Sequence, residues 1–177
     1  LNYYNRRTRE FKWYRPQEGR NSISHNNVKA LYYDADKEII WIGTHLGGLN
    51  KLDIRSGHFT HYRMEEGNPN TLPSDIIRDI IPYKSLLIIA TQNGVCLFHP
   101  ATGTCEHLFK DTKEGRNIGM VASLYIDKDE TLWVSATGEG VYSYRFDTGK
   151  LTHYAHNPSI PNTLSNNNVN NIMQDSN

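Results

Sequence analysis

Short runs of apolar residues, four to six residues long, recur along the whole chain between turns rich in Gly, Asp and Asn. The run Leu86–Ala90 is apolar throughout and does not alternate with polar residues. Short runs bounded by turn residues indicate β-strands, and a continuous apolar run indicates a strand covered on both faces. The pattern therefore predicts an all-β protein whose sheets are sandwiched between neighbouring sheets.

The runs belong to a repeat of about 46 residues. Its repeating members are Gly48, Gly94 and Gly140; Gly57, Gly103 and Gly149; and Trp41–Thr44, Ile88–Thr91 and Trp133–Ala136. Each copy has room for four short antiparallel strands. A repeat of 40–50 residues with four strands is typical of one β-propeller blade. The sequence thus predicts a partial β-propeller.

The repeat assigns a strand to each apolar run. Strand one is expected at Val28–Tyr33, Ile77–Pro82 and Val121–Ile126, and in a shortened copy at Val169–Met173; strand two at Ile39–Thr44, Leu86–Thr91 and Thr131–Ala136; strand three at Leu49–Asp53, Val95–His99 and Val141–Phe146; and strand four is expected to end at Tyr62, Leu108 and Tyr154. The expected division is strands three and four of one blade in 1–20, whole blades in 21–67, 68–113 and 114–156, and the first strand of a further blade in 157–177.

Both ends of the chain lie out of phase with the blades, and the first residue is Leu1. We therefore expect a piece of a longer protein whose other blades would pack against this one. Each end blade should expose an apolar face, which predicts self-association of the piece, with a dimer as the favoured form.

Composition excludes some function classes. Lys and Arg together number 19, as do Asp and Glu, so the formal net charge is zero. A nucleic-acid surface would need a basic excess, so no nucleic-acid partner is expected. The apolar runs are too short to span a bilayer, and no direct membrane contact is expected. Phosphate-binding loops, nucleophile elbows and Cys-x-x-Cys motifs are absent from the sequence, and no cofactor is expected.

Three segments carry a resemblance to a known family. Val28–Asp34, Ile40–Thr44 and Gly47–Asp53 resemble the two-component regulator propeller repeat, although Ile88 replaces the usual Trp in the next copy. The resemblance implies a propeller in the periplasmic region of a bacterial hybrid two-component sensor, an inner-membrane protein that detects carbohydrate breakdown products. It also implies that the kinase parts of the parent protein lie outside this chain, which would not itself be an enzyme.

Two acidic pairs are candidate catalytic groups. They are Asp34 with Asp36 and Asp127 with Asp129, each just before a strand with Trp. Because the pairs recur in step with the blades, we interpret them as turn residues whose side chains bond to nearby backbone N–H groups. A catalytic pair would occur once in a ring.

Two other groups of residues could carry chemistry. The motifs His58-x-x-His61 and His153-x-x-His156 have a spacing that would suit metal ligands, but a strand places i and i+3 on opposite faces, so no metal site is expected. Cys96 and Cys105 could form a cross-strand disulfide in an oxidising compartment, or remain buried thiols, and the sequence leaves both open.

The candidate ligand site is the upper face of the propeller. Its residues are expected in the turns between strands two and three, which carry His45, Gln92, Asn93 and Glu139, and in the loops between blades, which carry Arg20 and Arg116. Expected framework residues are Trp41, Trp133, Gly48, Gly94 and Gly140. Trp13 lies at the repeat position that His61 and His153 occupy in other copies, and its side chain could be exposed. Polar side chains that vary on a constant frame suit oligosaccharide binding.

The leading hypothesis is a ligand-sensing, carbohydrate-binding segment of a sensor. The alternatives are a fragment of a propeller glycoside hydrolase or lyase, and a protein–protein interaction scaffold. A hydrolase would need a carboxylate or Tyr constellation outside the repeat, and none is found in the sequence.

Overall fold

The computed structural model describes residues 1–109 and 118–175, and these residues form fourteen β-strands in an all-β fold. None of the described residues belongs to a helix that is long and apolar enough to cross a membrane. The strands make three four-stranded antiparallel sheets and one two-stranded hairpin. The predicted fold class, an incomplete propeller with four-stranded blades, is confirmed.

The three four-stranded sheets are named blades 1 to 3 in chain order. Blade 1 contains β3 (Val28–Asp34), β4 (Ile39–Thr44), β5 (Leu49–Asp53) and β6 (Phe59–Tyr62); blade 2 contains β7 (Ile77–Tyr83), β8 (Leu86–Thr91), β9 (Gly94–His99) and β10 (Thr104–His107); blade 3 contains β11 (Val121–Ile126), β12 (Thr131–Ala136), β13 (Gly140–Arg145) and β14 (Lys150–Tyr154). The hairpin contains β1 (Asn2–Asn5) and β2 (Glu10–Trp13). Strand bounds in the blades agree with the predictions to within one residue.

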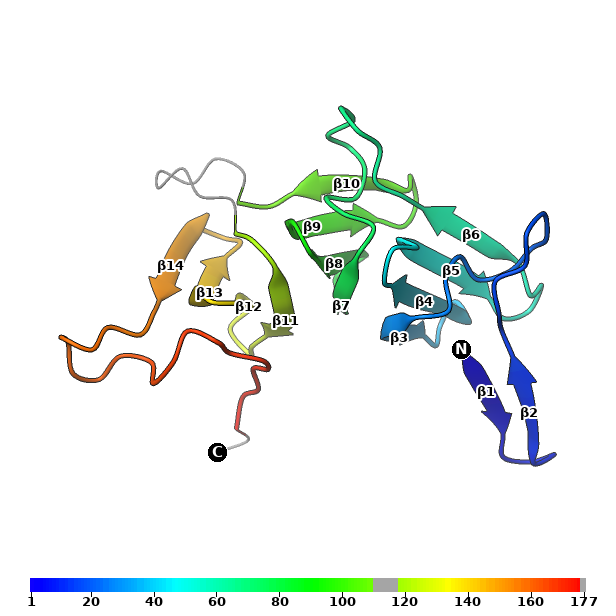
Figure 1. The fold of residues 1–177 in the computed structure, drawn as a ribbon, viewed down its shortest axis with the longest axis horizontal. Helices are drawn as coiled ribbons and strands as arrows, with labels where there is room; N and C mark the ends of the chain where they lie inside the picture. Colours follow the sequence, from blue (N-terminus) through cyan, green and yellow to red (C-terminus); the bar gives the residue numbers. More distant parts are fainter. Residues whose placement is uncertain (110–117, 176–177) are drawn as a thin grey trace.

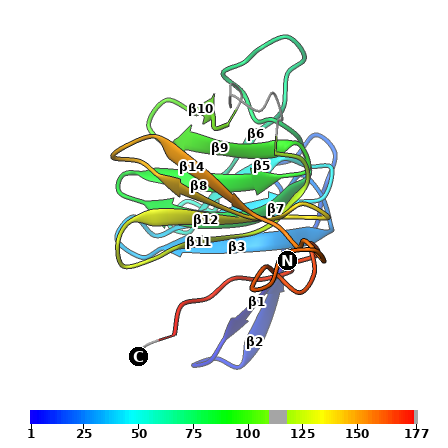
Figure 2. The same cartoon turned by 90° about the vertical axis from the view of Figure 1, so that its left-hand side faces the viewer.

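The blades stand side by side along an arc, with their first strands β3, β7 and β11 on its inner side (Figure 1). Figure 2 shows the blade strands running nearly parallel across the molecule, with the hairpin outside their stack. Strand order within each blade follows chain order, as expected for a sheet built from successive hairpins.

Two apolar clusters join the blades. Between blades 1 and 2, the Trp41 indole meets the Phe98 ring edge-on with centroids 5.3 Å apart, and Leu72 from the connecting loop is buried beside them. Between blades 2 and 3, Ile88 and Val134 are both fully buried. Each blade therefore buries one face against each neighbour, which explains why strands such as β8 are apolar without alternation.

Trp133 is less buried than the repeat predicted. Trp41 is only 2% exposed because blade 2 covers its face. Trp133 is partly buried, on a face of blade 3 that no other sheet formed by residues 1–109 and 118–175 covers. Its indole stacks on Tyr154 of the same blade, 5.7 Å away, and Tyr154 remains 43% exposed. The repeat position alone thus does not decide burial, because burial also needs a neighbouring blade.

The segment 169–173, predicted as a shortened strand, forms no strand. A strand needs backbone partners, and none of the strands in the described residues pairs with this segment. Side chains in this segment and just after it bond to blade 3 instead. The Ser123 hydroxyl donates to Oδ1 of Asn171 at 3.2 Å, and the Lys128 N–H donates to Oε1 of Gln174 at 3.3 Å.

The glycines that open strand three have a steric role. Gly48 has φ of +65°, and a Cβ there would lie 2.3 Å from the Tyr62 carbonyl oxygen. Gly140 has φ of +96°, and a Cβ added there would collide with the Tyr154 carbonyl oxygen in the same way. Only glycine tolerates both the positive φ and this close approach.

Candidate functional site

Three turns between strands two and three lie at one end of the blades, next to the starts of the inner strands. The first N–H of each turn donates to a carbonyl just before strand one: His45 to Asn27 (2.8 Å), Gln92 to Ile76 (2.9 Å) and Thr137 to Met120 (2.9 Å). We call this region the inner-end turns. The repeated hydrogen bond fixes each turn against its own inner strand, so the frame is the same while the side chains differ.

Gln92 and His45 both lie in this region, but they differ in their hydrogen bonds. Oε1 of Gln92 accepts a 2.7 Å hydrogen bond from Nη2 of Arg78, which fixes the amide. His45 is partly buried, and its Nδ1 is buried without a hydrogen-bond partner among the described residues. A buried ring nitrogen without a partner is a group that a ligand hydroxyl could satisfy.

Arg78 belongs to the same region and was not predicted from the sequence. It lies in β7 where the register with β8 shifts between Ile77 and Asp79, as in a β-bulge. The register shifts in the same way at Lys29 in blade 1 and Ala122 in blade 3. Bulges re-aim side chains and are common near functional sites. The repeat alignment could have flagged these positions, but only the strand pairing shows the bulge.

Glu139 lies in the third turn, with its polar groups bonded inside blade 3. Its Oε2 accepts the Tyr142 hydroxyl at 2.7 Å, and its backbone carbonyl is 2.6 Å from Nε2 of His153, which must donate there. The His153 ring stacks on Tyr142 with centroids 4.2 Å apart. These contacts tie Glu139 to its own blade.

The other predicted ligand residues are placed differently. Asn93 is exposed beside Gln92. Arg20 does not join the inner-end turns: its neighbour Asn21 bonds to the Gly57 carbonyl and the Phe59 N–H, in and just after the turn at the opposite end of blade 1. The loop before β3 therefore crosses the blade from end to end, which separates Arg20 from His45. Arg116 lies outside the described residues.

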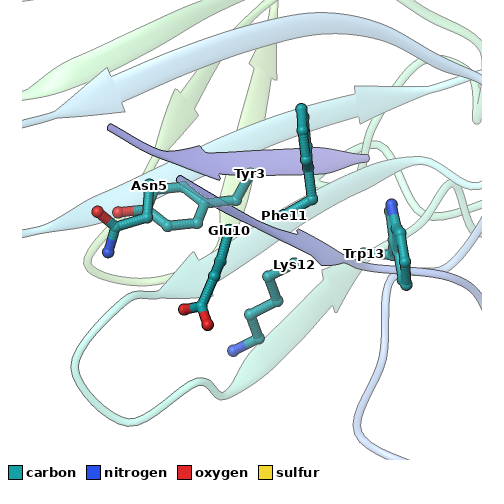
Figure 3. Close-up of a pocket in the computed structure, with 6 residues that line it drawn as sticks. All are labelled: Tyr3, Asn5, Glu10, Phe11, Lys12 and Trp13. Carbon is teal, nitrogen blue, oxygen red and sulfur yellow. The ribbon is translucent and has the colours of Figure 1, made fainter. Parts of the chain in front are cut away.

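The hairpin bears a surface depression of about 520 Å³ (Figure 3). Its lining residues are Tyr3, Asn5, Glu10, Phe11, Lys12 and Trp13. Trp13, whose position the sequence left open, is 65% exposed. Phe11 occupies the repeat position of Phe59, which is 6% exposed in blade 1, whereas Phe11 is 60% exposed. We therefore interpret this surface as the core face of an incomplete blade, which is exposed because the hairpin has only two strands. We do not interpret it as the ligand site.

The two acidic turns differ in detail. Oδ1 of Asp127 accepts the N–H groups of Asp129 and Thr131, at 3.0 and 2.9 Å. Burial opposes the charge, but hydrogen bonds from the Trp133 indole and the turn backbone outweigh it and lower the pKa of Asp127.

In blade 1 the salt bridge from the Lys37 ammonium, 2.9 Å away, lowers the pKa of Asp34. Both carboxylates are thus used within their turns.

Three of the four histidines in the two His-x-x-His motifs, His61, His153 and His156, bond through their rings to backbone carbonyls. Nε2 of His61 is 2.8 Å from the Ser22 oxygen, and Nδ1 of His156 is 2.6 Å from the Leu164 oxygen. Within the described residues, no three His, Cys, Asp or Glu side chains come together as a possible metal site.

Cys96 and Cys105 are buried free thiols with their sulfur atoms 3.4 Å apart. They are diagonal neighbours, because Cys105 pairs with Phe98 and Cys96 with His107. Burial raises the pKa of the Cys96 thiol well above its ordinary value, which suits inert packing.

A family model described as two component regulator propeller matches residues 22–45, which span the end of the loop before β3, then β3 and β4. The resemblance found in the sequence is therefore confirmed for this part of blade 1. No curated protein sequence matches the chain significantly.

Solved structures from B. thetaiotaomicron share the fold. The extracellular domain of a protein named as a hybrid two component system superposes with a TM-score of 0.74 at 21% identity, over 84% of this chain and 21% of its own. The extracellular domain of a one component system gives 0.54 at 21% identity, over 99% and 28%. An auxiliary nutrient binding protein gives 0.56 at 11% identity, over 72% and 30%.

The chain thus spans less than a third of the length of each of these structures. At these identities the likeness shows the fold alone, a propeller built from blades of this type.

Proposed function

We propose that this chain is a carbohydrate-binding propeller segment in the extracytoplasmic, periplasmic region of a hybrid two-component sensor, and that it binds its ligand without catalysis. Residues 22–45 match the regulator-propeller repeat. The observation that carries the proposal is that the three blades place unlike polar side chains at equivalent inner-end turns. The fold shared with extracellular domains of two-component proteins supports the location.

The inner-end turns offer the hydrogen-bonding groups that sugar hydroxyls need. Gln92 presents a fixed amide, Asn93 an exposed one, and His45 a ring nitrogen without a partner. Because the three turns are anchored to their inner strands, binding would cost little ordering of the protein backbone. A rigid frame with a few polar groups is the usual design of a small-ligand site.

The proposal of binding without catalysis rests on the acidic pairs. Asp34 and Asp127 hold their own turns together, and they lie at the ends of the first strands opposite the inner-end turns. A glycosidase needs two carboxyl groups facing one bond, one of which must be free to carry a proton. In a sensor of this kind, ligand binding at the site would be signalled to a kinase in the parent protein, and no chemical reaction at the site would be needed.

The test is binding and hydrolysis measured on the same glycans. The chain is titrated with plant and host oligosaccharides by calorimetry, and reducing ends are assayed after long incubation. We expect binding without new reducing ends. Gln92→Ala should weaken the binding, while Ser85→Ala, at the exposed opposite end of the strands, should leave it unchanged. Sustained hydrolysis, or equal binding by both variants, would contradict the proposal.

A further inference from the structure

We propose that the glycan bound at the inner-end turns carries an anionic group, a carboxylate or a sulfate ester, and that Arg78 binds this group. The inference rests on the proposed function and specifies its ligand class. It follows from the position of Arg78, from its uncharged surroundings and from a second cation at the same repeat position.

The bulge brings Arg78 out of the regular ladder of β7. Ile77 pairs with Thr91 and Asp79 pairs with Ala90, so Arg78 is the extra residue between two paired positions. A bulged residue is not held in the pleat, and its side chain is re-aimed. Its guanidinium reaches across to the next blade, where Nη2 lies 3.2 Å from the Met120 sulfur.

Among residues 1–109 and 118–175, the hydrogen-bond partners of this guanidinium carry no charge. Nη2 contacts the Gln92 amide oxygen and the Met120 thioether, and Nε is buried without a partner among the described residues. None of the ion pairs formed by the described residues includes Arg78. A partly buried cation without a counter-charge is costly, and a bound anion would offset that cost.

The acid adjacent to Arg78 in sequence forms no ion pair with it. Asp79 follows Arg78 directly, but its Oδ1 accepts the Ile80 N–H and its Oδ2 accepts the Leu124 N–H of blade 3, both at 2.9 Å. This carboxylate is used to join two blades. Within the part of the chain that the structure describes, no carboxylate pairs with Arg78, so its guanidinium can pair with an anionic ligand.

Lys29 occupies the corresponding bulge in blade 1 and is exposed. Its strand β3 and the Arg78 strand β7 are the inner strands of adjacent blades (Figure 1). The third bulge, in blade 3, carries the uncharged Ala122, so only blades 1 and 2 have a cation at this repeat position. The formal net charge of the whole chain is zero, so the two cations do not reflect an overall basic excess.

A guanidinium distinguishes an anionic sugar from a neutral one by geometry as well as charge. Its planar donors match two oxygens of a carboxylate or a sulfate, whereas an ammonium acts as a point charge. Neighbouring Gln92 and His45 would bond to the sugar hydroxyls next to the anionic group. Neutral glycans would leave the Arg78 charge without a partner and should bind more weakly.

The experiment compares matched probes on the 177-residue chain by calorimetry. The probes are oligogalacturonides, the same oligosaccharides fully methyl-esterified, and sulfated galacto-oligosaccharides. We expect an acidic probe to bind at least about tenfold more tightly than the ester, and Arg78→Gln to remove about tenfold of that affinity. Comparing the two acidic probes decides between carboxylate and sulfate.

The control is Arg55→Gln, which removes the same charge at the opposite end of blade 1, where Arg55 pairs with Glu38. It should bind all probes like the unchanged chain. Equal loss in both variants would show general electrostatics and overturn the assignment. Arg78→Lys keeps the charge and decides if Arg78→Gln does not fold: its affinity for the acidic probe should fall, and an unchanged affinity would overturn the proposal.

Failure of this inference is distinct from failure of the proposed function. Neutral glycans that bind as tightly as acidic ones, with affinity lost in Gln92→Ala and kept in Arg78→Gln, would overturn the anionic ligand and leave a carbohydrate site in place. Absence of binding to every glycan would overturn both.

Discussion

The indole Nε1 of Trp133 donates a 2.7 Å hydrogen bond to Oδ2 of Asp127 in blade 3. The same carboxylate accepts two N–H groups of its own turn through Oδ1. One side chain thus connects the turn between strands one and two to the face of strand two. In blade 1 the equivalent Asp34 bonds to Lys37 instead, so the arrangement is particular to blade 3.

The first prediction concerns Asp127→Asn. The folded chain lowers the pKa of this carboxyl group, so its charged form stabilises the fold above the unfolded pKa, and this contribution is lost as pH falls through the folded pKa. We expect Asp127→Asn to lower the free energy of unfolding by about 1–2 kcal/mol at pH 7. The difference should shrink as pH falls below about 4.

Urea denaturation at pH 7, 5 and 3 measures this effect. The matched control is Asp129→Asn, because Asp129 is exposed and contributes its backbone N–H to the turn. An Asp127→Asn variant with the stability and pH dependence of Asp129→Asn would show that the carboxylate does not stabilise the turn.

The second prediction compares two tryptophans at one repeat position. Trp41→Ala should cost about 3–5 kcal/mol, because it empties a site enclosed by two blades. Trp133→Ala should cost about half as much, since Trp133 is partly exposed and stacks only within its own blade. Chemical denaturation of both variants provides the comparison, and equal costs would mean that blade 2 does not decide the burial of Trp41.

The third prediction concerns two glycines with similar φ. Gly57 has φ of +71° with open space at the Cβ position, so Gly57→Ala should cost about 1 kcal/mol from the left-handed backbone alone. Gly48→Ala adds a collision with the Tyr62 carbonyl and should cost about 2–3 kcal/mol. Thermal and urea unfolding test the order, and a Gly57→Ala cost equal to that of Gly48→Ala would refute the steric argument.

For the fourth prediction, we propose that the chain self-associates through its end blades. Leu31 and Tyr33 of β3 are 54% and 53% exposed on blade 1, while Tyr154 and part of Trp133 are uncovered on blade 3. Apolar faces of this kind favour association in water. Sedimentation velocity at micromolar concentration should show a concentration-dependent dimer that Leu31→Lys weakens. A monomer at all concentrations would exclude the proposal.

Much of the fold follows from the sequence because it depends on local pattern. The 46-residue spacing of Gly48, Gly94 and Gly140 marks the start of strand three in every blade, and each such turn needs a positive φ. Apolar runs between turn residues set the strand bounds. These features come from contacts within one hairpin, so they repeat whenever the local sequence repeats.

The candidate site was only partly predictable. The inner-end positions of His45 and Gln92 follow from the repeat, since both begin the same turn. Arg78 does not, because its role depends on a bulge in the pairing with β8 and on a contact with Met120, which lies 42 residues away in sequence. The prediction that Arg20 lies with these turns was wrong. The sequence of a loop does not indicate which end of a blade each of its residues approaches.

What the sequence by itself determined was therefore the blade: its strands, its turns and its repeat. The tertiary structure decided everything that needs two blades. It buries Trp41 and leaves Trp133 partly exposed, it leaves 169–173 without strand partners, and it carries the Arg78 guanidinium across to the next blade. The physical reason is that strand and turn formation is a local balance, whereas burial and charge environment depend on surfaces far apart in the chain.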